Sequence, residues 1–140
     1  MGGSGVQRIE WDSRFELGIE DIDLEHRYFL NLIHRILDEM RSEGDPAHRT
    51  GLIEELNAYA RFHFISEENM MRRAGYPELD AHREHHRRLT DELSAKQAFL
   101  AMQPSEAHAE AILGFLQTWF VEHTLKEDRR FATFLGKKRA

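Results

Sequence analysis

Histidine is the most distinctive residue type in this chain, which holds nine histidines and no cysteine among its 140 residues. Histidine is the commonest side-chain metal ligand in proteins and the side chain that titrates near neutral pH. Two pairs of candidate ligands stand four residues apart, namely His63 with Glu67 and His82 with His86. Residues at this spacing are neighbours on one face of a helix, so their side chains can converge on one ion. The residue types and their spacing therefore predict a metal site.

Other histidines and carboxylates interrupt the apolar faces of the predicted helices. His26 follows Ile22 by four residues, and His123 follows Trp119 by four. An unpaired charged group is costly in a protein core, and buried charges are usually paired or bound to metal ions. Five histidines and two carboxylates fall on the inward faces of all four predicted helices: His26, His63, Glu67, His82, His86, His123 and an acidic residue near position 128. We therefore predict that these residues form one metal centre.

The spacing does not settle the identity of the last carboxylate. Glu127 is four residues from His123, whereas five residues place Asp128 about 140° around a regular α-helix from that histidine. However, Asp128 also follows Phe120 by eight residues and precedes Phe131 by three, which places it near the apolar face. On the residues alone, both carboxylates remain candidates.

The ligand types favour a pair of iron ions. Imidazole suits zinc, copper, iron and nickel, whereas carboxylates favour harder ions. The number of ligands exceeds what one tetrahedral zinc ion uses, but it fits two ions that share bridging carboxylates. The sequence contains neither the Glu-x-x-His motif of ferritin-like di-iron proteins nor the H-E-x-x-H motif of zinc proteases. We therefore predict a di-iron centre of another type.

Four amphipathic helices are predicted to position these ligands. Apolar residues recur at steps of three and four residues, and Gly and Pro divide the pattern into segments. The segments cover about 21–41, 46–74, 77–102 and 104–135. Gly44, Gly75 and Gly136 are expected to end the first, second and fourth helices, and no strand or hairpin signal is found in the sequence. Because the loops are short, we expect an all-α, up-down-up-down antiparallel four-helix bundle.

The remaining segments are expected to belong to the same domain. Residues 1–5 are interpreted as a flexible leader or a remnant of cloning. Residues 6–20 carry Trp11 and Phe15 without helical spacing, and we predict that they form an ordered N-terminal arm. The length favours a single domain, here residues 6–140.

Charge and hydropathy exclude several classes of partner. The net charge of -6 argues against nucleic-acid binding, which needs clustered Lys and Arg. No apolar run approaches the length of a membrane span, so no membrane partner is expected. No signal-peptide pattern is found, which favours a cytoplasmic location.

This combination of motifs resembles the hemerythrin family, and its bacterial single-domain members, the bacteriohemerythrins, most closely. The resemblance covers the chain from Trp11 to about Leu135. Its marks are Gly18-Ile19, Ile22-Asp23-Leu24-Glu25-His26, His63-Phe64-Ile65-Ser66-Glu67-Glu68, Gly75-Tyr76-Pro77, the segment from His82 to His86, and Trp119-Phe120-Val121-Glu122-His123 with Asp128. Any one of these motifs alone would be weak, but together they are highly specific.

The resemblance implies a role for each candidate ligand. One iron would have three terminal histidines and the other would have two: His82, His86 and His123 on the first, and His26 and His63 on the second. Glu67 and Asp128 would bridge the two ions beside an oxo or hydroxo group, so the resemblance favours Asp128 over Glu127.

The resemblance also implies a function. The iron with two histidines would keep an open position in its reduced state, where O₂ would bind reversibly. Four residues near the ligands are candidates for lining the O₂ pocket: Ile22, Leu30, Tyr59 and Trp119. The first hypothesis is thus a protein that stores, delivers or supplies oxygen and is not an enzyme.

Three alternatives use the same ligands. The chain could be an O₂- or redox-sensing domain that acts on a signalling partner. It could be a di-iron enzyme that processes peroxide or nitric oxide. It could also be a structural bundle that holds zinc or mixed metals, and iron analysis would separate this case from the others.

Overall fold

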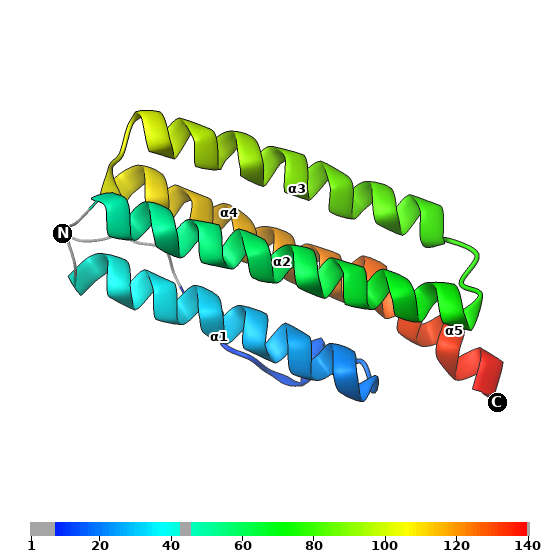
Figure 1. Cartoon of the computed structure of the whole chain (residues 1–140). Coiled ribbons are helices and arrows are strands. Elements are labelled where there is room, and N and C mark those ends of the chain that lie inside the picture. Colours follow the sequence, from blue (N-terminus) through cyan, green and yellow to red (C-terminus); the bar gives the residue numbers. More distant parts are fainter. Residues whose placement is uncertain (1–7, 43–45, 140) are drawn as a thin grey trace.

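The structure, a computed structural model, describes residues 8–42 and 46–139 and contains four long antiparallel helices (Figure 1). The helices are α1 (Glu20–Ser42), α2 (Pro46–Ala74), α3 (Leu79–Met102) and α4 (Glu106–His123), and α4 continues through a π-helical segment, η2 (Thr124–Asp128), into α5 (Arg129–Arg139). A short 3-10 turn, η1 (Ser13–Phe15), precedes α1. The up-down-up-down bundle predicted from the sequence is confirmed, and the described residues form no strand.

Three of the expected helix ends differ from the structure by two residues or more, and one of them is the start of α4, at Glu106 instead of residue 104. The third helix begins at Leu79 rather than at Pro77. The prediction that Gly136 ends the last helix is wrong, because α5 continues to Arg139. A glycine inside a helix costs only about 1 kcal/mol relative to alanine, and Lys138 holds this turn by donating a hydrogen bond to the carbonyl of Ala74. The expected stop at Gly44 and the leader at residues 1–5 lie outside the described residues.

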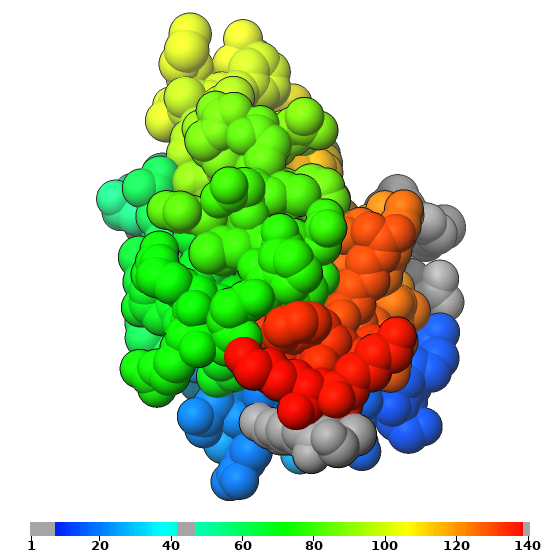
Figure 2. Space-filling view, turned by 90° about the vertical axis from the view of Figure 1, so that its right-hand side faces the viewer, coloured from blue at the N-terminus to red at the C-terminus, as the bar shows by residue number. Residues whose placement is uncertain are grey.

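Gly75 ends α2 as expected. Its φ is +71°, a left-handed conformation that glycine adopts without steric cost. The turn after it brings Tyr76 against Phe131 and Phe134 of α5, with ring centroids 5.1 and 5.2 Å apart. Figure 2 looks onto this end of the molecule, where α5, in red, lies against the green surface of α2 and α3. None of the described helices is both long and apolar enough to cross a membrane.

The core consists of two apolar clusters with a polar layer between them. The larger cluster fills most of the bundle and includes Phe29, Phe64 and Phe120. The smaller cluster lies toward α5 and consists of Ile19, Ile22, Met71, Tyr76, Phe131 and Leu135. In the sequences of α1, of α2 and of the continuous run from α4 to α5, the predicted ligands come between residues of one cluster and residues of the other. The fold therefore places these polar side chains across the middle of its apolar core.

The N-terminal arm packs against α1 and α4. Phe15 is completely buried, and its ring centroid lies 5.8 Å from that of Phe120. The backbone N–H of Ile9 donates to Gln117 Oε1 over 3.1 Å. The carboxylate of Asp23 accepts hydrogen bonds from the backbone of residues 17 and 18, over 2.9 and 3.1 Å. These contacts fix the arm beside the helices that carry the predicted ligands.

Candidate metal centre

Seven buried side chains meet in the polar layer. Their exposed fractions range from 0% for Glu67 to 6% for His123. They come from every long helix: His26 from α1, His63 and Glu67 from α2, His82 and His86 from α3, His123 from α4, and Asp128 from η2. Two sets among them bring their ligand atoms within 4.8 Å of one another, and Glu67 belongs to both sets.

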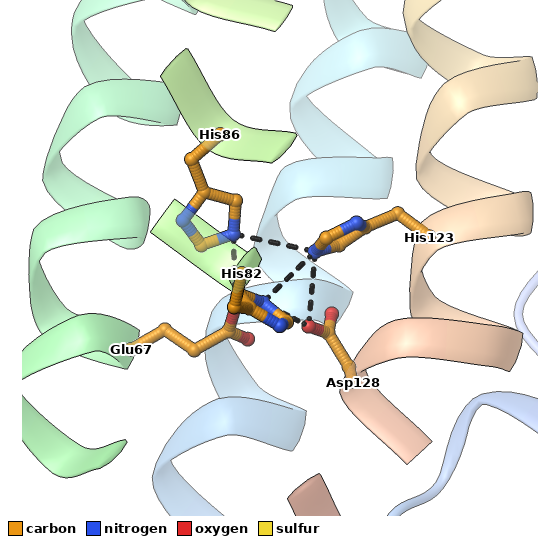
Figure 3. Close-up of side chains that lie close together, drawn as sticks. All are labelled: Glu67, His82, His86, His123 and Asp128. Carbon is orange, nitrogen blue, oxygen red and sulfur yellow. Dashed lines mark hydrogen bonds and ion pairs between the residues drawn. The ribbon is translucent and has the colours of Figure 1, made fainter. Parts of the chain in front are cut away.

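Three histidines form one group, in which the Nε2 atoms converge (Figure 3). His123 Nε2 lies 3.1 Å from His82 Nε2 and 3.2 Å from His86 Nε2. When two imidazole nitrogens bind the same ion, each at about 2.0–2.1 Å, the two nitrogens lie about 3 Å apart. The spacing of these three nitrogens therefore suits a shared cation.

The other two histidines form a second group on α1 and α2. The rings of His26 and His63 meet edge-on, with centroids 4.7 Å apart. Their Nε2 atoms lie 3.6 and 3.7 Å from Glu67 Oε2. This group has fewer imidazoles than the first, so an ion here would have fewer protein ligands.

Each carboxylate turns one oxygen toward each histidine group. Glu67 Oε1 lies 2.8 Å from His82 Nε2 and 3.1 Å from His86 Nε2, while Oε2 faces the two-histidine group. Asp128 Oδ1 lies 3.0 Å from His82 Nε2, and Oδ2 lies 3.1 Å from His26 Nε2. Both carboxylates therefore stand between the groups, in positions from which each could contact two ions.

The π-helical segment explains why Asp128, five residues after His123, returns to the face of that histidine. A π-helix forms hydrogen bonds between residues i and i+5 instead of i and i+4. Asp128 is consequently 1% exposed, beside His123. Glu127, the alternative favoured by four-residue spacing, is not in the cluster: its carboxylate lies 3.5 Å from Arg130 and 3.9 Å from His85.

Several polar atoms of the cluster lack hydrogen bonds. Glu67 Oε2, both carboxylate oxygens of Asp128 and Nδ1 of His26 are buried with no aligned hydrogen-bond partner among the described residues. The carboxylate oxygens lie close to imidazoles but are poorly aligned for hydrogen bonding. Because unsatisfied buried carboxylates are costly, cations between them and the imidazoles would account for the arrangement. The residues present therefore fit a metal centre.

Comparisons with known proteins support the same interpretation. A family model described as the hemerythrin HHE cation binding domain matches residues 17–135. The chain belongs to the hemerythrin family. A bacteriohemerythrin of Clostridium acetobutylicum is 30% identical over 124 residues, which cover 86% of this chain and 96% of the relative. A bacteriohemerythrin of Pseudomonas aeruginosa is 28% identical over 123 residues, or 88% of this chain and 78% of the relative. A myohemerythrin of Theromyzon tessulatum is 25% identical over 122 residues, covering 87% of this chain and 89% of the relative.

Membership of the hemerythrin family implies that the domain binds iron. All seven side chains of the cluster lie within the matched residues 17–135. Histidine with carboxylate is also a donor set that iron accepts. The expected family resemblance is therefore confirmed.

The imidazoles and carboxylates of this hemerythrin domain shift one another's pKa values. Burial alone would lower the pKa of His26, but the carboxylates of Asp128 and Glu67 raise it to about 10. The same two carboxylates overcome burial at His82 and raise its pKa to about 9. In turn, the imidazoles hold the pKa values of Glu67 and Asp128 well below their usual range, although burial acts in the opposite direction. The carboxylates are thus anionic, and protons or metal ions compete for the histidines.

Aromatic rings surround the cluster. Trp119 stacks on His123 with centroids 4.3 Å apart and planes 13° apart, and Phe64 stacks on His86 at 4.0 Å and 10°. On the two-histidine side the contacts are edge-on, by Phe120 to His26 at 5.4 Å and by Phe29 to His63 at 6.3 Å. These rings shield the centre from water.

The residues predicted to line an O₂ pocket lie at different distances from the cluster. Trp119 contacts it directly. Tyr59 is half-buried, and its hydroxyl donates to the backbone carbonyl of Glu25 over 2.7 Å. Ile22 is fully buried in the smaller apolar cluster, and Leu30 is buried in the larger one. Their role in oxygen binding stays a prediction.

The sequence did not indicate a role for two glutamates that contact the cluster. Glu25 Oε1 lies 2.7 Å from His63 Nδ1, and Glu68 Oε2 lies 2.8 Å from His86 Nδ1. Each glutamate is adjacent in sequence to a ligand, which was the available signal. Spacing on one helix could not identify them, because each contacts a ligand on a neighbouring helix.

Proposed function

We propose that this hemerythrin domain holds two iron ions and binds O₂ reversibly, for the storage, delivery or supply of oxygen. The observation that supports this proposal most strongly is the orientation of Glu67 and Asp128. Each directs one oxygen toward the three-histidine group and the other toward the two-histidine group. Such carboxylates would bridge two ions.

The proposed ligands divide between two ions. His82, His86 and His123 would hold one ion, and His26 and His63 would hold the other. Two ferrous ions held in this way would supply electrons to O₂ when it binds and would take them back when O₂ leaves. The ion with two imidazoles would have the more open coordination, so we place O₂ binding on that side.

The surroundings of the site favour reversible binding over turnover. Phe29 and Phe120 meet the rings of the two-histidine group, and the buried ligands leave little access for water. Departure of the bound oxygen as hydrogen peroxide requires protons, so low access for water and protons should slow this irreversible loss. We therefore propose a binding protein, for which turnover of hydrogen peroxide or nitric oxide should not exceed that of free iron.

The test is the visible absorption spectrum of one anaerobically reduced sample whose iron is counted. We expect two irons per chain, a colourless reduced form, charge-transfer bands when air is admitted, and loss of those bands under vacuum. A ferric spectrum that forms at once in air and survives vacuum would overturn reversible oxygen binding. One iron per chain, or a preference for zinc, would overturn the di-iron assignment.

A further inference from the structure

Glu25 and Glu68 contact the outer nitrogens of two ligand histidines. Glu25 Oε1 lies 2.7 Å from His63 Nδ1, and Glu68 Oε2 lies 2.8 Å from His86 Nδ1. In both rings the opposite nitrogen, Nε2, faces Glu67, at 3.7 and 3.1 Å. A carboxylate at Nδ1 favours the tautomer that carries its proton there, and this leaves the Nε2 lone pair for an ion.

Both glutamates are themselves held by neighbouring groups. Ser66 Oγ donates to Glu25 Oε2 over 2.8 Å. The Nε of Arg83 lies 3.5 Å from Glu68 Oε1. The side chains of Glu25 and Glu68 are only 17% and 19% exposed, so their contacts with the imidazoles are partly shielded from water. Each carboxylate is therefore fixed against its histidine.

The two glutamates act between helices. Glu25 precedes the ligand His26 on α1, and Glu68 follows the ligand Glu67 on α2. A step of one residue turns about 100° around a helix, so each glutamate faces the adjacent helix while its neighbour faces the centre. Glu25 thus reaches a ligand on α2, and Glu68 reaches a ligand on α3. One glutamate serves each histidine group.

We propose that Glu25 and Glu68 are positioning residues of the iron centre, which orient His63 and His86 and increase their basicity. This inference rests on the proposed function, because it assumes that both histidine groups bind iron. Outer partners of metal-bound histidines hold the ring orientation, and their loss typically costs about 10–100-fold in metal affinity.

The effect is expected to be larger at Glu25. In the two-histidine group, His26 Nδ1 is buried with no hydrogen-bond partner in the described part of the chain. The contact of Glu25 with His63 Nδ1 is therefore the carboxylate contact that orients a ring of this group. In the other group, stacking by Phe64 already restrains the ring of His86. Removal of Glu25 should therefore loosen the ion of the two-histidine group more than removal of Glu68 loosens its counterpart.

The experiment compares alanine and glutamine variants at both positions. Glu→Ala removes the hydrogen bond and the charge, whereas Glu→Gln keeps an acceptor and removes only the charge. Glu122→Ala is the matched control, because Glu122 is an exposed glutamate that is also adjacent to a ligand, His123. Each protein is loaded with Fe²⁺ under nitrogen, and we measure iron per chain, the rate of iron removal by a chelator, and the midpoint potential.

We expect about 10–100-fold weaker iron binding for Glu25→Ala, a smaller loss for Glu68→Ala, and partial rescue by glutamine at both positions. The potential should rise, because a less basic imidazole stabilises ferric iron less. Glu122→Ala should match the wild type. The metal-free variants should have the same melting temperature as the metal-free wild type.

Other outcomes would overturn the inference. If the wild type binds two irons and the variants bind them with unchanged affinity and potential, Glu25 and Glu68 do not position ligands, while the proposed function stands. If the variants lose iron only in proportion to a lower melting temperature of the metal-free protein, their role is general stability. If the wild type itself binds no iron, the proposed function fails, and the positioning role that rests on it fails with it. Loading with Zn²⁺ repeats the affinity comparison without redox chemistry.

Discussion

At the scale of single residues, Glu67 links the two histidine groups. It is completely buried, and its two oxygens face different groups. The imidazoles around it keep the pKa of its carboxyl well below the usual range, although burial and the nearby Asp128 raise it. Glu67 is therefore an anion at any pH near neutrality, and it is available to ions on both sides.

Replacing Glu67 with alanine should reduce bound iron from two ions per chain to one or none. The substitution removes an oxygen from each proposed ion and leaves the imidazoles with Asp128 alone. Glu68→Ala is the comparison, because it changes the next residue and removes an outer contact rather than a proposed ligand. It should still bind two irons when iron is in excess. Equal iron contents in the two variants, measured by metal analysis after desalting, would rule out a bridging role for Glu67.

The sequence could predict some residues of the cluster better than others. His63 with Glu67, and His82 with His86, are spaced by four residues on regular helices, so their convergence follows from helix geometry. The contact between Glu25 and His63 depends on how α1 lies beside α2. A pattern along one helix holds no information about such packing, so the outer glutamates could be identified only in the fold.

At the scale of elements, η2 is the feature that brings Asp128 to the centre. The four helices and their order could be predicted from apolar spacing, glycines and prolines, but the π-helical segment could not. Its residues, Thr-Leu-Lys-Glu-Asp, contain no proline or glycine that would mark an irregular turn. The five-residue gap between His123 and Asp128 was the one indication, and it conflicted with a regular α-helix.

Deleting Lys126 should retain most of the iron binding, whereas inserting one alanine after Lys126 should abolish it. The deletion shortens the step from His123 to the aspartate from five residues to four, or about 40° around a regular α-helix, and the residues after Asp128 keep their register with it. The insertion lengthens this step to six residues, or about 240°, which directs the carboxylate away from His123. Lys126 is exposed, so its own side chain contributes little to the core.

Iron per chain after anaerobic loading, together with helix content from circular dichroism, would test this pair of variants. The insertion variant should remain helical while it loses iron. If it binds as much iron as the deletion variant, the alignment provided by η2 does not determine ligand placement.

At the scale of the whole molecule, the metal centre is part of the core. The polar layer separates two apolar clusters, and its side chains come from every long helix. Without metal, the bundle has to accommodate five imidazoles and two carboxylates in this layer. Protons then take the place of cations, as the raised pKa values of His26 and His82 indicate. Fold stability and metal binding must therefore respond to pH in opposite directions.

The metal-free protein should lose stability as the pH rises from about 6.5 toward 10. The pKa of His26 is raised from 6.5 to about 10 and that of His82 to about 9, so the folded chain holds protons that the unfolded chain has released. Each such histidine lowers the free energy of unfolding as the pH rises from 6.5 to its own pKa in the folded chain, and its stabilising contribution is complete below pH 6.5. The lowered pKa values of Glu67 and Asp128 act at the other end, and their stabilisation is lost only as the pH falls below about 4.

Iron binding should show the reverse dependence, because the metal displaces these protons and its affinity rises with pH. The difference in melting temperature between the iron-loaded and metal-free proteins should therefore widen steadily between pH 6.5 and 9. Thermal melts of both forms across this range, at constant ionic strength and free metal concentration, would measure it. A difference in melting temperature that stays constant across this range would mean that the histidines of the metal-free core are neutral and release no protons when iron binds.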